Sequence, residues 1–195
     1  MFVDWDDLAR EFEQEIEVDD INDFMKIVDT SVGSKIEEFR EQLEKAKPED
    51  FRTEYEYSDY QDYVSEMWNQ KESTKTLAGE LAIVAIYKRI EIHTVHLVKK
   101  YMHLPSGRKI SSIIELGQIV PFPLNGVVGY HAFDELRLVN NSIKHEGKVS
   151  RLLATAFPNW VEGNDFGDLE GTYQRLLPGV KTYVKSLATQ LQTLP

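Results

Sequence analysis

The 195-residue sequence contains no cysteine. Disulfides, thiolate nucleophiles and cysteine-ligated zinc or iron–sulfur sites are therefore excluded. Long apolar runs are also missing, since no stretch approaches the roughly 20 apolar residues that a membrane span needs. The N-terminal sequence MFVDWDDLAREFEQEIEVDD is acidic from its fourth residue and lacks the basic segment and apolar run of a signal peptide. We therefore expect a cytoplasmic protein with no membrane-spanning segment.

The common nucleotide-binding motifs are missing as well. The sequence has no glycine-rich phosphate loop, no dinucleotide fingerprint and no tandem repeat. It also lacks the alternation of apolar and polar residues that is typical of strands. Hydrophobic residues make up 42% and charged residues 28%, which is typical of a globular protein. The helical periodicity that remains predicts an all-α fold, a helical bundle.

Two helices are predicted to form the centre of this bundle. Residues 77–103 carry apolar side chains almost all round the first half of the helix, which is typical of a helix with several neighbours. Residues 130–146 place Phe133, Val139 and other apolar side chains on one side, and Gly147 is suited to cap the helix. We expect these two helices to pack as an antiparallel pair.

Further helices are predicted around this pair. Apolar residues at spacings of three and four mark residues 20–46 most strongly. Pro178 is expected to begin the last helix, because proline is favoured in a first turn. The other predicted helical segments are residues 4–17, a tyrosine-rich stretch around 60–67, a short helix from Ser111, and residues 150–156, 169–177 and 178–191.

Charge is unevenly distributed along the chain. Residues 1–66 contain 22 acidic and 7 basic side chains, whereas residues 67–195 contain 11 acidic and 15 basic ones. We expect an acidic helical region, residues 1–66, that packs on a core of residues 67–195 to form a single compact unit. The acidic region would aid solubility, bind a basic partner or cover the core, and the basic core would hold phosphates locally.

All five histidines lie on the two predicted central helices. On the first helix, a basic stripe falls within a narrow sector at helical spacing and comprises Arg89, His93, His96, Lys100 and His103. We predict substrate contacts for the first four. A packed or solvent-facing polar edge is the alternative. A metal at the two paired histidines is disfavoured, because no carboxylate ligands follow at the expected spacing and the lysine would repel a cation. No metal and no cofactor is expected.

The second central helix ends in the stretch LRLVNNSIKHEG, residues 136–147. This stretch resembles the signature helix of the HEPN superfamily, α-helical proteins of which many are metal-independent endoribonucleases in toxin–antitoxin and phage-defence systems. His145 matches the motif histidine, and Asn141 matches the polar residue that follows the motif arginine. Asn140 occupies the place of that arginine, and Arg137 precedes His145 with seven intervening residues.

The resemblance implies a homodimer in which both motifs face one RNA cleft, with an antitoxin or another protein as a further partner. His145 would act as general base or acid while a ribose 2′-hydroxyl attacks its own phosphate. Asn141 would orient the imidazole or a phosphate oxygen. Arg137, Lys144 or Lys148 would stabilise the developing negative charge.

Other interpretations of these residues and of the whole chain stay open. Lysine and histidine are favourable at a helix C-terminus because of the helix dipole, so KHEGK needs no active site to explain it. Asn140 and Asn141 are also suited to inter-helix hydrogen bonds. The protein is thus a HEPN-like endoribonuclease, a non-catalytic HEPN-like module that binds RNA, a nucleotide or a protein, or an acidic interaction protein.

Overall fold

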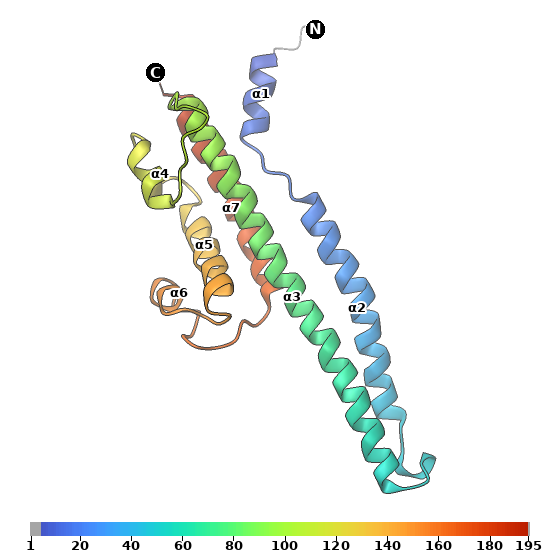
Figure 1. Cartoon of the computed structure of the whole chain (residues 1–195). Helices are drawn as coiled ribbons and strands as arrows, with labels where there is room; N and C mark the ends of the chain where they lie inside the picture. The colour runs from blue at the N-terminus through green and yellow to red at the C-terminus, as the bar shows by residue number, and fades with distance from the viewer. Residues whose placement is uncertain (1–4, 195) are drawn as a thin grey trace. The chain divides into compact units, whose positions relative to one another are not determined.

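The computed structural model describes residues 5–194, and within them it confirms the all-α bundle: helices are present and no strand is. Residues 1–4 and 195 lie outside the described part, so the predicted beginning of the first helix at Asp4 is not covered. No helix of the described part is long and apolar enough to cross a membrane. The helices are α1 (Trp5–Glu13), α2 (Asp19–Lys45), α3 (Glu54–Tyr101), α4 (Ile113–Ile119), α5 (Tyr130–His145), α6 (Arg151–Ala156) and α7 (Leu169–Gln192), with 3-10 turns at Pro48–Asp50 and Leu124–Gly126 (Figure 1).

The chain divides into two compact units. Unit 1 comprises Met1–Val18 and Ile83–Pro195, and unit 2 comprises Asp19–Ala82. Unit 2 carries 17 acidic and 8 basic side chains, whereas unit 1 carries 16 and 14. The division differs from the expected boundary after residue 66, because α3 continues through that position and the chain passes from one unit to the other within this helix.

Unit 2 is a hairpin of α2 and the first half of α3, which lie side by side (Figure 1). Lys75 on α3 forms a 2.8 Å ion pair with Asp29 on α2. The tyrosine-rich stretch begins α3, so the prediction of a separate helix from residue 77 was wrong. The residues in between, WNQKESTKT, contain neither glycine nor proline, and three of their hydroxyls bond carbonyls four residues earlier. Nothing in this polar stretch therefore interrupts the helix.

Unit 1 is centred on α5, which packs against α7 on one side and α3 on another. The ring of Phe133 on α5 stacks on Tyr183 of α7 at 4.3 Å between centroids and lies 6.3 Å from the ring of Tyr87 on α3. The part of α3 in unit 1 runs antiparallel to α5, as predicted (Figure 1). Burying each large aromatic or aliphatic side chain contributes about 1.5–3 kcal/mol.

The first turn of α5 touches the backbone of α7. Gly129, which precedes α5, has φ of +88°, and a Cβ there would lie 2.5 Å from the carbonyl oxygen of Gly179. A Cβ on Gly179 would in turn lie 2.6 Å from that of Ala132. Only glycine fits at these two positions, since a side chain would force the helices apart.

The end of α5 and the start of α6 follow the sequence prediction. Gly147 adopts φ of +66°, and its N–H donates to the carbonyl of Ser142 at 3.0 Å. Ser150 caps α6 by accepting a 3.2 Å hydrogen bond from Leu153 N–H. The beginning of the last helix was predicted wrongly, because α7 starts at Leu169 and holds Pro178 in its interior. Buried side chains on both sides of the proline, such as Tyr173 and Val180, keep the helix continuous despite one lost hydrogen bond.

Candidate functional site

The second half of α5 lines an open cleft of about 350 Å³ in unit 1. Across from it lie side chains of α3 and the residues that lead into α4. The lining contains three cationic side chains and a single carboxylate, so the cleft carries a positive balance that favours an anionic ligand. Its lining residues are Arg137, Asn140, Asn141 and Lys144 from α5, Val84, Tyr87, Lys88 and Glu91 from α3, and Ser111, Ser112, Ile113 and Ile114.

The three cations of this cleft differ in how far they are already engaged. Lys88 forms a 2.9 Å ion pair with Glu91. Arg137 donates from Nε and Nη2 to one carboxylate oxygen of Asp134, at 2.9 and 2.7 Å. Lys144 is exposed, and its side chain has no ion pair or hydrogen bond among residues 5–194. Lys144 is therefore the cation of the cleft that is most available to a ligand.

The two asparagines of the motif stretch interact with each other. Asn140 is buried, and its amide nitrogen donates to the Asn141 side-chain oxygen at 3.3 Å. This bond lies within one helix, not between two as the alternative interpretation has it. The buried amide oxygen of Asn140 has no hydrogen-bond partner in the described part of the chain. Such an oxygen costs about 1–3 kcal/mol unless a water or ligand satisfies it.

The predicted catalytic histidine lies outside the cleft. His145 is the last residue of α5 and is exposed, and its side chain makes no hydrogen bond or ion pair with the residues that the structure describes. It follows Lys144 directly, yet its ring is not part of the cleft lining. Lys148 also lies outside and forms a loose 3.5 Å ion pair with the exposed Asp165. The structure thus brings Arg137, Asn141 and Lys144 together and leaves the imidazole apart.

No family model, curated protein or solved structure matches the chain. The HEPN resemblance therefore stays a prediction.

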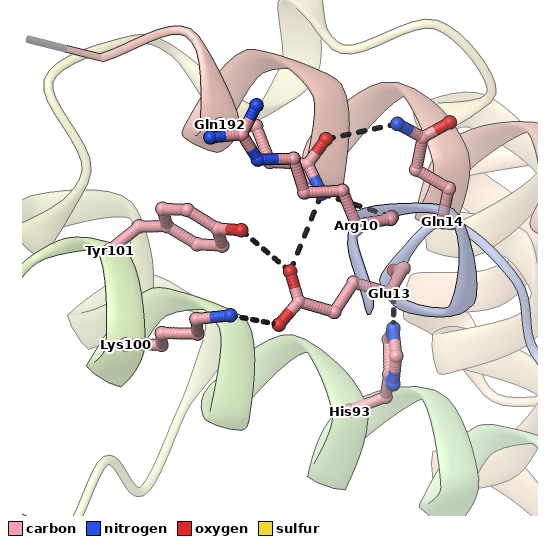
Figure 2. Close-up of polar contacts among 7 residues, drawn as sticks. All are labelled: Arg10, Glu13, Gln14, His93, Lys100, Tyr101 and Gln192. Carbon is pink, nitrogen blue, oxygen red and sulfur yellow. Dashed lines mark hydrogen bonds and ion pairs between the residues drawn. The ribbon is translucent and has the colours of Figure 1, made fainter. Parts of the chain in front are cut away.

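The basic stripe on α3 contacts the chain's own N-terminal segment (Figure 2). Lys100 Nζ donates to one carboxylate oxygen of Glu13 at 2.5 Å, and Tyr101 Oη donates to the other at 2.6 Å. Gln192, at the end of α7, adds a 3.3 Å bond to the same carboxylate. This Glu13 cluster ties α1 to both α3 and α7.

Two further residues of the stripe bind main-chain carbonyls of the same segment. His93 Nε2 lies 2.9 Å from the Glu13 carbonyl oxygen, and Arg89 Nη1 donates to the Glu17 carbonyl at 2.6 Å. His96 is exposed beside an open groove, and His103 follows α3 in a left-handed conformation. No group of three metal-ligating side chains occurs among residues 5–194. Three residues of the predicted stripe, Arg89, His93 and Lys100, thus contact the N-terminal segment of the same chain.

The Glu13 carboxylate is held in its charged form by these donors. Partial burial raises its pKa, but the hydrogen bonds from Lys100, Tyr101 and Gln192 outweigh burial and bring the pKa below the usual carboxylate value. The same contact raises the pKa of Lys100. The sequence pattern marked the lysine but gave no signal for Glu13 or Gln192, since their meeting depends on how distant segments pack.

A second carboxylate cluster, also missed by the sequence, lies on α5. Glu135 is buried, and its two oxygens accept hydrogen bonds from Arg175 of α7 at 2.7 and 3.0 Å. Trp160 Nε1, in the loop before α7, donates to it at 2.9 Å. Burial raises the pKa of Glu135, but these bonds more than compensate and lower it overall. The Glu135 cluster joins three segments around a buried carboxylate, which favours a structural role.

Proposed function

We propose that the protein is HEPN-like and binds single-stranded RNA in the cleft between α3 and α5. The observation that carries this proposal is the convergence of Arg137, Asn141 and Lys144 on one cleft. Phosphate oxygens would accept hydrogen bonds from the guanidinium and the ammonium group, which are the side chains best suited to that contact. The Tyr87 ring and the isoleucines on the opposite wall offer apolar surface to a base or sugar.

The geometry favours binding over cleavage. General acid or base catalysis requires a side chain within hydrogen-bond reach of the reacting proton. The His145 ring is not in the cleft lining, and the Arg137 guanidinium is engaged by Asp134. A phosphate in the cleft would therefore contact cationic side chains, of which Lys144 has no partner among residues 5–194. It would contact no imidazole.

RNA cleavage is the second candidate, and one observation favours it. His145 is exposed, without a partner among residues 5–194, and directly follows the free cation Lys144. A second copy of the chain placed across this end of α5 would bring another His145 or another cleft to the same phosphate. This arrangement matches the dimer that the family resemblance implies.

Binding is tested with a fluorescein-labelled 20-nucleotide oligouridylate and its fluorescence anisotropy. We expect Lys144→Ala to raise Kd by roughly fivefold and to lower the salt slope by about one, because one phosphate contact is lost. Lys148→Ala is the matched control, since it removes the same charge from the same end of the motif but outside the cleft. An equal loss in both variants would show that binding follows net charge and would contradict the proposed cleft.

Cleavage is tested by incubating the same RNA with the protein in EDTA. Products that end in a 2′,3′-cyclic phosphate and disappear in His145→Ala would establish the endoribonuclease. RNA that is bound but stays intact would support binding without cleavage. His96→Ala serves as the control, because it removes another exposed histidine of the same unit.

A further inference from the structure

The Glu13 cluster has the composition of an anion-binding site that is already filled. Three donors converge on one carboxylate, and they come from a lysine, a tyrosine and a glutamine on two helices. The Glu13 side chain retains only 14% of its exposure there. Figure 2 shows these donors pointing at the carboxylate from α3 and α7 while His93 reaches the carbonyl of the same residue. A phosphate oxygen would accept from the same donors.

The helix that delivers this carboxylate is held mainly by polar contacts. Trp5 is 74% exposed and Phe12 is 65% exposed, so α1 buries neither of its aromatic side chains. The helix has nine residues, a length at which isolated helices are marginal in water. The buried anchors of the segment, Ile16 and Val18, come after the helix. We therefore expect residues 5–13 to detach more readily than the residues that follow them.

The charges of the two contacting parts also favour an anion-binding site beneath the N-terminal segment. Residues 5–18 carry six acidic side chains and one basic one, whereas residues 83–195 carry nine acidic and thirteen basic ones. The segment is thus an acidic strap on the basic part of unit 1. A polyanion would be attracted to the face that this strap contacts.

We propose that Lys100, Tyr101 and Gln192 form a second phosphate-binding site, for which the Glu13 carboxylate competes within the same chain. Release of residues 5–13 opens the site to an RNA phosphate, and His93, no longer bonded to the Glu13 carbonyl, joins it. RNA as the ligand rests on the proposed function, but the site and its competitor are distinct from the α5 cleft. At neutral pH the carboxylate is charged, so bound RNA must displace it.

The first test is Glu13→Gln, measured by anisotropy with the labelled oligouridylate. Glutamine keeps an oxygen that can accept hydrogen bonds but removes the charge, so the fold is retained while competition weakens. We expect affinity for RNA to rise roughly three- to tenfold. Glu11→Gln is the matched control, since it removes the same charge from an exposed position of the same helix. Adding Lys100→Met to Glu13→Gln should remove the gain.

Hydrogen exchange of the α1 backbone provides a second readout. In the wild-type protein, saturating RNA should speed exchange in residues 5–13 and leave residues 16–18 unchanged. Unchanged or slower exchange in α1 on RNA binding would overturn the proposal. So would an equal gain in affinity from Glu11→Gln and Glu13→Gln, because net charge alone would then explain it.

These measurements separate this site from the α5 cleft. Suppose that Lys144→Ala has no effect, that Glu13→Gln tightens RNA binding, and that Lys100→Met removes this gain. The site at Lys100 is then supported and RNA binding in the α5 cleft is contradicted. If Lys144→Ala weakens RNA binding and Glu13→Gln changes the affinity no more than Glu11→Gln does, the α5 cleft is supported and the site at Lys100 is contradicted.

Discussion

Glu13 and Glu135 are two carboxylates of unit 1 that have similar hydrogen-bond partners. They differ in how well the helices that carry them are packed. Each is largely buried, each accepts hydrogen bonds from a cation and an aromatic side chain, and each has a lowered pKa. Glu135 lies in the middle of α5, whose neighbouring residues Leu136, Leu138 and Val139 are buried. Glu13 ends a short helix whose aromatic side chains face solvent.

The difference shows that the role of a buried carboxylate depends on the segment that carries it. The hydrogen bonds of Glu135 add to extensive apolar packing, so breaking them exposes Arg175 and Trp160 without releasing α5. The bonds of Glu13 are a large part of what holds α1, so breaking them releases a segment. One cluster is a permanent cross-link, and the other is suited to exchange its carboxylate for another anion.

The largest effect is expected for Glu135→Ala. This substitution leaves the Trp160 N–H and the Arg175 guanidinium without their acceptor, at a cost of about 2 kcal/mol in the free energy of unfolding. The cost is smaller than for a fully buried pair, because the arginine is half exposed. Urea unfolding followed by circular dichroism measures it, with the exposed Glu162→Ala as control. A cost below about 0.5 kcal/mol would show that the cluster contributes little.

Acid should act on both carboxylates in the same direction. Their folded-state pKa values lie below the ordinary value of 4.5, so their contribution to stability is complete at neutral pH. It declines only as the pH falls below that value and through the folded-state pKa values. The indole N–H signal of Trp160 in an NMR titration should shift in this acidic range. The wild-type protein should lose more stability there than Glu135→Gln does, and equal losses would contradict the assignment.

A smaller effect on global stability is expected for Glu13→Ala. Lys100 is about half exposed, so solvent screens the ion pair and the cost in unfolding free energy should be about 1 kcal/mol or less. Backbone exchange in α1 should nevertheless become clearly faster. If Glu13→Ala destabilises the protein as much as Glu135→Ala, α1 is an integral part of the core, and the contrast between the two carboxylates is wrong.

Local patterns in the sequence predicted much of the fold. The spacing of apolar residues predicted α2 and α5 to within about a residue at each end, and the residue types at Gly147 and Ser150 predicted the end of α5 and the start of α6. Local patterns failed where tertiary packing decides the outcome. Pro178 is a favourable first-turn residue, yet α7 runs through it because both of its halves are packed. The polar stretch after Trp68 looked like a gap between helices but lacks any residue that ends one.

The candidate sites were predictable in part for the same reason. Helical spacing placed Arg137, Asn141 and Lys144 near one another, and all three line the cleft. Spacing also collected Arg89, His93 and Lys100 into one stripe, but what the stripe binds lies about 80 residues away along the chain. Periodicity within one helix carries no information on such a partner. The same limit hid the contact between Glu135 and Arg175, which are 40 residues apart.

The meeting of Gly129 with Gly179 sets the orientation of α5. Because backbone touches backbone there, α5 can neither turn about its own axis nor slide along α7 without a collision. The directions of Arg137, Asn141 and Lys144 are thereby fixed from two to four turns away, by the lack of a side chain at two positions. In a saturation library, Gly129 and Gly179 should tolerate fewer replacements than Arg137 and Lys144, whose directions they determine.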